Sequence, residues 1–263
     1  MREYHVGVIG YGFMGKTHTH SYKTIPLYYT NLPFTIRLEG ICDTVPGVAE
    51  EARQMQGFAY ATTDPERIIS DPNIDIVSIC TPNVFHKDLV LRALRAGKHV
   101  YCDKPLTATA EESREILEAL PSFAGQTTQV ALQMRFYPAV MRAKELIREG
   151  RIGRVFLFQC DYLHSSGIDP NKTLSWKQNR AFGGGGVLLD LGAHAYDVMY
   201  HLLGEYQSVY TMTDIVYPTR PGSDGAPVKV EAEDTALTIA TMHSGAMGKI
   251  LVSKVATGSM DEL

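Results

Sequence analysis

The segment VGVIGYGFMG, residues 6–15, decides how the first half of the chain is interpreted. It holds a GxGxxG pattern between an apolar strand-like run and a helix-like run. In that setting the first glycine permits a tight turn, the second lets the backbone approach a pyrophosphate, and the third lets helix and strand pack closely. Phosphate oxygens would bind the free N–H groups at the start of the helix. The pattern favours a dinucleotide site over a simple glycine turn, and the predicted site residues are Gly10, Gly12, Phe13, Met14 and Gly15.

Strand-like and helix-like runs alternate through the first half of the chain. The strand-like runs are Tyr4–Ile9, Ile36–Cys42, Ile74–Cys80, His99–Cys102 and Thr128–Leu132. Helix-like patterns lie between them, at residues 15–24, 46–56, 84–96 and 110–120. Apolar strands that alternate with helices indicate a parallel sheet covered on both faces. Residues 1–134 are therefore predicted to form an α/β Rossmann domain with a doubly wound parallel sheet.

The second half has a different pattern. A helix-like run at residues 138–149 is followed by β-branched or alternating runs at 154–162, 208–217, 234–243 and 246–255. Turn-rich segments such as PTRPGSDGAP, residues 218–227, join them. This pattern predicts an α+β domain over residues 135–263, with an open, largely antiparallel sheet and one helical face.

Charge and composition argue against several classes of function. The net charge is −4 and no basic tract is present, so a nucleic-acid partner is not expected. No apolar run reaches membrane-spanning length, so no membrane association is expected either. The first residues enter a strand pattern at once, which leaves no room for a signal peptide. Four cysteines lie far apart without a CxxC pair, which favours reduced thiols in a cytoplasmic protein and no metal site.

Asp43 ends the second strand-like run and is a candidate for binding the cofactor ribose. An acidic side chain at this point accepts hydrogen bonds from the ribose diol of NAD and repels the 2′-phosphate of NADP. Residues 44–46 contain no Arg or Lys, so NAD is favoured over NADP. The segment TIPLYYTNLPF, residues 24–34, is interpreted as an inserted loop that widens the spacing from the glycines. A strand-end turn residue is the alternative for Asp43.

The segment CTPNVFH, residues 80–86, follows the strand-like run that ends at Cys80. The carboxyl end of such a strand faces the ligand crevice of a doubly wound sheet. Helix capping would also explain the asparagine in this segment. The predicted cofactor contacts are Thr81, Pro82, Asn83 and His86.

Lys104 follows the next strand-like run, in HVYCDKPLT, residues 99–107. Pro105 disfavours the α region for Lys104, so the lysine backbone is expected to be extended. A lysine held at the crevice end of a central strand could bind a hydroxyl and stabilise a developing alkoxide. A surface lysine in a turn is the alternative.

The segment FGGGGVLLDLGAHAYDVMYHLLGE, residues 182–205, predicts a helix over 186–204 that begins after four glycines. Asp190, His194, Asp197 and His201 form a stripe beside its apolar face. Three interpretations compete for this stripe: a solvated polar face with i,i+4 pairs, a divalent-metal site, and acid–base catalysis. In the third, His194 takes a hydroxyl proton while Asp190 holds the imidazole ring. The glycines would leave space for a substrate or cofactor ring against the backbone.

Together these segments resemble the glucose-fructose oxidoreductase / inositol 2-dehydrogenase / rhizopine catabolism (Gfo/Idh/MocA) oxidoreductases. The resemblance runs in order along nearly the whole chain, through GYGFMG, TPNVFH, AGKHVYCDKPL, RFYPAV with EGRIGRV, and GGGGVLLDLGAHAYD. It implies hydride transfer between NAD(P) and a hydroxyl or carbonyl carbon of a sugar, cyclitol or related polyol. It also implies a homodimer or homotetramer that assembles through the C-terminal sheet.

The same resemblance implies roles for individual residues. The catalytic lysine of the family matches Lys104, and its aspartate and histidine match Asp190 and His194. The family motif EKP has glutamate where this chain has Asp103, which is placed with Lys104 among the cofactor contacts. Family members continue beyond VATGSMDEL, so the second sheet is expected to be truncated here. Weaker candidates for binding substrate hydroxyls are Tyr162, Trp176 and Asp197, with Asp161 and His164.

Two rival functions remain open at this point. A dinucleotide-binding regulator without turnover would share the fold, but such proteins tend to lose the lysine or the histidine that this chain keeps. A glycosidase that uses NAD transiently would oxidise, eliminate, add water and reduce with the same residues. Net consumption of NAD separates these functions, because it is stoichiometric for a dehydrogenase and absent for the other two.

Overall fold

The computed structural model describes residues 1–259. The chain divides into two compact units between Ala131 and Leu132. Unit 1 begins at Met1, and unit 2 begins at Leu132. The boundary expected near Met134 falls within a short 3₁₀ helix, η3 (Gln133–Phe136), at the start of unit 2.

Unit 1 is built on a six-stranded sheet in which every neighbouring pair of strands is parallel. The strand order is β3-β2-β1-β4-β5-β6, the order of dinucleotide-binding folds. The order reverses between β1 and β4, which places the ligand crevice at the carboxyl ends of these two strands. The predicted parallel Rossmann sheet is confirmed. Its strands are β1 (Arg2–Ile9), β2 (Phe34–Cys42), β3 (Tyr60–Thr62), β4 (Ile76–Ile79), β5 (His99–Cys102) and β6 (Thr128–Val130).

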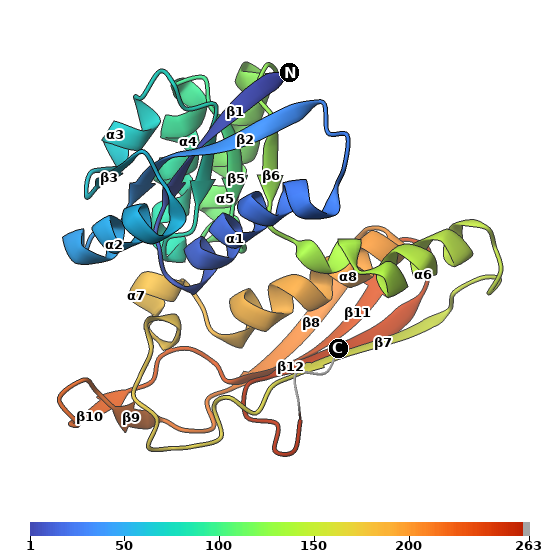
Figure 1. The fold of residues 1–263 in the computed structure, drawn as a ribbon. Coiled ribbons are helices and arrows are strands. Elements are labelled where there is room, and N and C mark those ends of the chain that lie inside the picture. Colours follow the sequence, from blue (N-terminus) through green and yellow to red (C-terminus); the bar gives the residue numbers. More distant parts are fainter. Residues whose placement is uncertain (260–263) are drawn as a thin grey trace. The chain divides into compact units, whose positions relative to one another are not determined.

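Helices cover both faces of this sheet (Figure 1). One face buries Val6 and Val8 of β1 together with Ala52 of α2. The opposite face buries Val77 and Ile79 of β4 with apolar residues of α3, α4 and α5. Because both faces of the sheet are buried, successive residues of its strands are apolar, and the strands appear in the sequence as continuous apolar runs. The helices are α1 (Phe13–Tyr28), α2 (Pro46–Gln56), α3 (Pro65–Ile69), α4 (His86–Arg95) and α5 (Ala110–Ala119).

Two features of unit 1 differ from the sequence-based expectation. The segment interpreted as an inserted loop begins as helix, because α1 continues past Pro26 to Tyr28. The proline removes only its own N–H donor, and the next turn closes with a bond of 2.9 Å from Tyr29 N to Ile25 O. The strand β3 and the helix α3 were not predicted, since runs of three and five residues are too short to establish a period.

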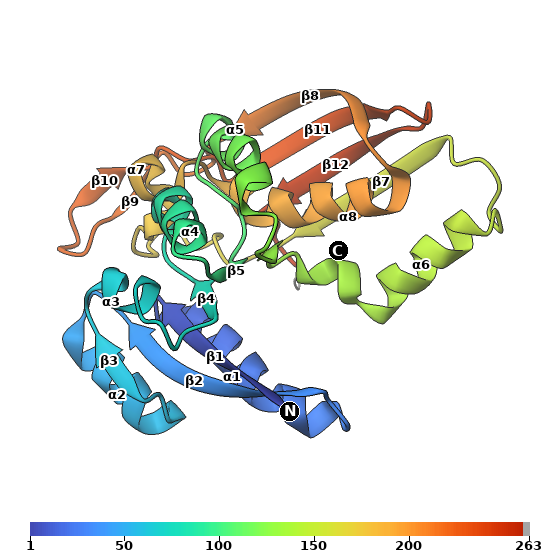
Figure 2. The same cartoon turned by 90° about the horizontal axis from the view of Figure 1, so that it is seen from above.

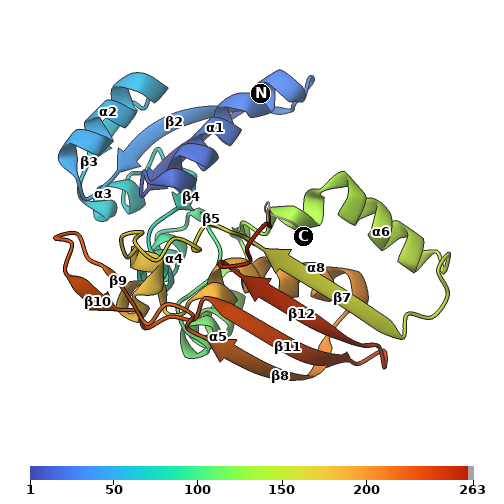
Figure 3. The ribbon, with the colours of Figure 1, turned by 90° about the horizontal axis from the view of Figure 1, so that it is seen from below.

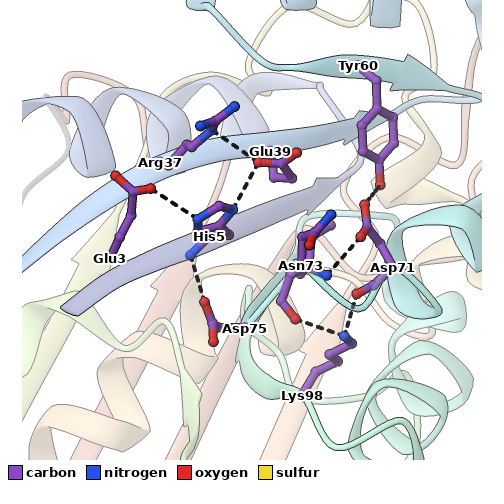
Figure 4. Close-up of polar contacts among 10 residues, drawn as sticks. Glu3, His5, Arg37, Glu39, Tyr60, Asp71, Asn73, Asp75 and Lys98 are labelled. Atoms are coloured by element: carbon purple, nitrogen blue, oxygen red, sulfur yellow. Dashed lines mark hydrogen bonds and ion pairs between the residues drawn. The ribbon is translucent and has the colours of Figure 1, made fainter.

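The amino-terminal ends of the parallel strands carry a network of polar contacts (Figure 4). The ring of His5 lies 3.0 Å from Glu39 Oε2, and its backbone N–H donates to the carboxylate of Asp75. The Lys98 ammonium donates to two backbone carbonyls, those of Asp71 (2.6 Å) and Ile74 (2.8 Å), and burial lowers its pKa. These contacts close the loop before β4 at the end of the sheet away from the crevice.

Unit 2 contains a four-stranded sheet of order β7-β12-β11-β8. The pairs β12–β11 and β11–β8 are antiparallel, whereas β7 and β12 are parallel, so the predicted open, largely antiparallel sheet is confirmed. A separate hairpin joins β9 (Thr219–Pro221) to β10 (Pro227–Lys229) in the turn-rich segment. The sheet strands are β7 (Leu157–Leu163), β8 (Tyr206–Asp214), β11 (Thr235–Met242) and β12 (Met247–Ser253).

One face of this sheet is covered by the helix α8 (Ala193–Leu203), as Figure 2 shows. Val198 and Met199 of α8 pack there against Ile250 and Val252 of β12. The opposite face, seen in Figure 3 with α8 behind the strands, keeps large apolar side chains exposed. The other helices of unit 2 are α6 (Pro138–Arg148) and α7 (Arg180–Gly183).

Candidate active site

The three glycines between β1 and α1 have different surroundings. Gly10 has φ +90°, and a Cβ there would lie 2.7 Å from the Cys80 carbonyl oxygen. A Cβ on Gly15 would lie 2.0 Å from Gly10 O, so this glycine allows helix and turn to touch. A Cβ on Gly12 would meet nothing within 4 Å. Gly12 caps α1 without a side-chain hydrogen bond, which leaves the first N–H groups of the helix able to bind an anion.

The carboxylate of Asp43 is oriented by two backbone N–H groups. Oδ2 accepts a bond of 2.9 Å from Tyr11 N, and Oδ1 accepts one of 3.0 Å from Val45 N. Each oxygen of an ionised carboxylate can accept a second hydrogen bond. Asp43 is thus fixed beside the glycine turn while it keeps acceptor capacity for two hydroxyls.

The segment after β4 contains two buried polar residues, Asn83 and His86. Asn83 begins the 3₁₀ helix η1 (Asn83–Phe85), whose N-cap is Pro82, and the N-cap of α4 is Phe85. Capping therefore does not explain Asn83. His86 is fully buried, with Nδ1 2.9 Å from Pro105 O and Nε2 2.9 Å from Thr81 O. Because both ring nitrogens contact backbone carbonyls, this geometry places His86 behind the loop rather than on the crevice surface.

Lys104 lies in the turn that follows β5. Its backbone N–H donates to Asp103 Oδ1 at 2.8 Å, and the carboxylate of Asp103 is buried. The Lys104–Pro105 peptide bond is cis. His86 holds the Pro105 carbonyl, so it connects the Lys104 turn to the Thr81 segment.

A buried polar group behind this crevice was not predicted. His18 of α1 stacks on Tyr101, and its Nδ1 lies 2.9 Å from Ser78 Oγ and 3.2 Å from Cys80 Sγ. Burial lowers the pKa of His18 and raises the pKa of the Cys80 thiol, so both groups are held in their neutral forms. The group packs α1 against β4 and β5 rather than supplying a nucleophile.

Asp190 and His194 of unit 2 are separated by one irregular turn of helix. The expected straight helix is instead a π-helical turn, η5 (Leu188–Gly192), followed by α8. Such π turns occur frequently at functional sites. The carboxylate of Asp190 contacts two lysines, Lys177 Nζ at 2.9 Å and Lys254 Nζ at 3.0 Å. Neither lysine was predicted, because they lie 13 and 64 residues from Asp190 and follow no periodic pattern.

The glycine run before η5 has a different role from the one expected. A Cβ on Gly186 would lie 2.2 Å from the backbone oxygen of Glu233, so this glycine admits a neighbouring segment of the protein. Glu233 Oε1 accepts bonds from Gly186 N (2.9 Å) and Leu188 N (3.2 Å), and Val187 N donates to Glu233 O. The interpretation that the glycines leave space for a ligand ring is corrected at Gly186, where Glu233 fills that space.

The remaining predicted residues fall into two groups. Tyr162 packs edge-to-face on His194, with ring centroids 6.2 Å apart, and on His164 at 4.8 Å. Asp197 instead forms a two-point ion pair with Arg135, whose Nε donates to Oδ2 at 2.7 Å. This pair fastens α8 to η3 and accounts for Asp197 without a substrate. Trp176 begins the 3₁₀ helix η4 (Trp176–Gln178) and is exposed.

Comparison with known proteins decides the family. A model described as "Oxidoreductase family, NAD-binding Rossmann fold" matches residues 4–131, and one described as "GFO/IDH/MocA C-terminal domain" matches residues 140–262. The chain is a Gfo/Idh/MocA oxidoreductase. The resemblance inferred from the motifs is thereby confirmed, together with the NAD-binding fold.

Several relatives of this Gfo/Idh/MocA oxidoreductase have named activities. Levoglucosan dehydrogenase of Pseudarthrobacter phenanthrenivorans is 35% identical, over 98% of this chain and 69% of its own length. The scyllo-inositol 2-dehydrogenase (NAD(+)) of Bacillus subtilis is 29% identical, over 94% of this chain and 66% of its own. A solved structure of levoglucosan dehydrogenase in complex with NADH superposes with a TM-score of 0.95 over 99% of this chain and 69% of that one. The chain thus spans about two thirds of the length of these relatives.

The residues of unit 1 fit the dinucleotide that the family description names. Gly12 offers open space before the unsatisfied N–H groups of α1, and Asp43 offers oriented acceptors for a ribose. Among residues 1–259 no helix is both long and apolar enough to cross a bilayer. Within the same residues, no cluster of three His, Cys, Asp or Glu side chains is arranged to hold a metal ion.

Proposed function

We propose that this oxidoreductase is an NAD-dependent dehydrogenase that oxidises a secondary hydroxyl of a sugar, cyclitol or related polyol. The observation that carries the proposal is the placement of Asp190 on the π turn η5 and of His194 one turn later in α8, in a chain whose other unit has the NAD-binding fold. The named activities of the relatives support this substrate class, since levoglucosan and scyllo-inositol both carry secondary hydroxyls.

In this proposal each catalytic group has one task. Bound NAD⁺ supplies the hydride acceptor. His194 takes the hydroxyl proton as the carbinol carbon becomes a carbonyl, and Asp190 supports the imidazolium that forms. The Lys104 ammonium stabilises the partial negative charge on the oxygen. The products are the ketone, NADH and one proton, so atoms and electrons balance.

The cofactor of the proposed reaction is NAD rather than NADP. Asp43 offers a carboxylate acceptor where the proposal puts the ribose, and Val45 and Pro46 follow it instead of a basic residue. A 2′-phosphate placed there would meet a carboxylate without a cationic partner from residues 44–46.

We also propose that two or more copies associate through the exposed face of the unit 2 sheet. Tyr210 of β8 and Ile239 of β11 are neighbours in register on this face and are 66% and 55% exposed. Large apolar side chains in adjacent strands are typical of protein–protein contacts.

The experiment that tests the reaction uses the purified chain with NAD⁺ or NADP⁺ and a panel that includes levoglucosan, inositols, glucosides and sugar acids. We expect stoichiometric formation of reduced cofactor with at least one polyol and a clear preference for NAD⁺. Lys104→Ala should lower kcat by about a hundredfold or more, as expected for loss of charge stabilisation at the reacting oxygen. Undiminished turnover would overturn the Lys104 role. Glycoside cleavage without net NADH would favour the glycosidase, and cofactor binding without chemistry would favour the regulator.

A further inference from the structure

The Asp190 carboxylate is held between two ammonium groups from distant parts of unit 2. Lys177 belongs to η4 and contacts Oδ1, whereas Lys254 directly follows β12 and contacts Oδ2. The two contacts are 2.9 and 3.0 Å long. Each carboxylate oxygen therefore has its own cationic partner, which fixes the plane of the carboxylate as well as its charge.

The two lysines differ in burial and in backbone support. The side chain of Lys254 is 14% exposed, and that of Lys177 is 45% exposed. The Lys254 backbone is bound on both sides, because its N–H donates to Asp234 O at 2.9 Å and its carbonyl accepts from Gly167 N at 2.7 Å. Water screens the Lys177 contact more than the Lys254 contact, so the Lys254 contact is the stronger one.

One short segment positions both sides of the Asp190–Lys254 pair. Glu233 binds the N–H groups of Gly186 and Leu188 and so places η5, which carries Asp190. The adjacent Asp234 accepts the backbone N–H of Lys254. The carboxylate and the ammonium are therefore aligned through residues 233–234, and both of these residues are buried.

We propose that Lys254 is a positioning residue for the reaction, which keeps the Asp190 carboxylate ionised and fixed one turn before His194. An ammonium at 3.0 Å favours the charged form of a carboxylate. A fixed negative charge there stabilises the imidazolium that His194 becomes when it takes a proton. Charged or titratable groups that contact η5 or Asp190 in unit 2 include Lys177, Lys254 and Glu233. This inference rests on the proposed dehydrogenase function.

The test compares Lys254→Met with Lys254→Arg and Lys177→Met. Loss of the buried ammonium should move the acidic limb of the pH profile of kcat/KM upward by about one unit. Below that limb the rate should then be about tenfold lower than in the wild type. Lys254→Arg should restore most of the profile, and Lys177→Met should shift it less. NADH affinity should stay unchanged, because the Rossmann fold belongs to unit 1.

Lys249→Met is the matched control. Lys249 lies on β12, the strand that Lys254 follows, is 42% exposed and pairs with Asp161 at 3.5 Å, so its loss should leave the pH profile unchanged. An unshifted profile in Lys254→Met would overturn the proposal. Equal damage in Lys254→Met and Lys254→Arg would also overturn it, because that result points to packing rather than charge.

A second readout does not require turnover. The carboxyl carbon NMR signal of Asp190, assigned with Asp190→Asn, should titrate at higher pH in Lys254→Met than in the wild type. An unchanged titration would overturn the positioning role. A wild-type protein that oxidises no polyol, but whose Asp190 signal responds to Lys254→Met, would instead refute the proposed function and leave the ion pair established.

Discussion

Gly12 and Gly15 lie in the same turn but have different roles: Gly12 is predicted to serve cofactor binding, and Gly15 is predicted to serve folding. A Cβ at position 12 meets nothing within 4 Å, whereas one at position 15 lies 2.0 Å from Gly10 O. Gly12→Ala should therefore fold normally but raise the Kd for NADH by about tenfold or more. Gly15→Ala should lower the free energy of unfolding by about 3 kcal/mol or more. Urea unfolding and NADH fluorescence titration measure the two effects, and equal behaviour of the variants would contradict this separation.

The negative charge of Asp43 is predicted to set the preference for NADH over NADPH, and the neutral isostere Asn tests this role. Asp43→Asn keeps the size of the side chain but removes the negative charge beside the ribose. We expect the Kd for NADH to rise about tenfold, since hydrogen bonds to charged groups contribute about 1.5–3 kcal/mol. The Kd for NADPH should fall, because the repulsion of the 2′-phosphate is relieved. Asp88→Asn, on the exposed side of α4, serves as the control. An unchanged ratio of the two affinities would contradict the assigned role.

At the residue scale, the sequence yields candidate site residues only where a local pattern marks them. The glycine turn, Asp43, Lys104 and the Asp190–His194 spacing all lie in short segments with a recognisable order. Lys177, Lys254 and Glu233 could not be found in this way, because folding alone brings them to Asp190 and η5. A lysine directly after the apolar strand ILVS was the one available hint for Lys254.

At the scale of elements, hydrophobic periodicity alone was not enough to predict the structure of residues 186–204. A period of 3.6 residues predicted a continuous α-helix. The structure instead has a π-helical turn, η5, between Gly186 and α8, and such a turn holds more residues than an α-helical turn. The long-range bonds from Glu233 stabilise this turn, and no local pattern encodes them. The four-residue stripe is consequently divided, with Asp190 bound by lysines and Asp197 bound by Arg135.

The contact of His86 with two loops yields a prediction at the same scale. The ring nitrogens of His86 contact the carbonyl oxygens of Pro105 and Thr81. A carbonyl oxygen only accepts, so a hydrogen bond forms wherever the ring nitrogen carries a hydrogen. At least one ring nitrogen of the imidazole carries a hydrogen, so His86→Leu removes at least one buried hydrogen bond and should cost about 1–3 kcal/mol of unfolding free energy. Because the Lys104 turn loosens, kcat should fall more than the NADH affinity. The exposed His20, changed to Leu, is the control. A His86→Leu variant as stable as His20→Leu would contradict the role of His86 in joining the two loops.

At the scale of the whole molecule, the alternation of apolar strands and helices was sufficient to predict the parallel sheet of unit 1. The change of pattern after it predicted the largely antiparallel sheet of unit 2. Short elements escaped prediction because three to five residues carry too little periodicity, as β3, α3 and the β9–β10 hairpin illustrate. The pairing of β7 with β12 was also not foreseeable, since 83 residues separate the end of one from the start of the other.

The exposed face of the unit 2 sheet makes self-association testable. Ile239→Asp places a charge among apolar neighbours and should convert the proposed oligomer to a monomer at micromolar concentration. Sedimentation velocity measures the change. Met55→Asp, which alters an apolar residue on α2 of unit 1 that is 66% exposed, should leave the oligomer intact. A wild-type monomer, or an Ile239→Asp variant that still associates, would contradict the proposed interface.

The most direct test of the central claim is polyol oxidation by His194→Asn with NAD⁺. Loss of the general base should lower kcat by about a hundredfold or more, while the Kd for NADH, which binds to unit 1, stays the same. We predict stoichiometric NADH formation by the wild type and this selective loss in the variant. Equal turnover by the two proteins would contradict the assignment of His194 as the group that accepts the hydroxyl proton.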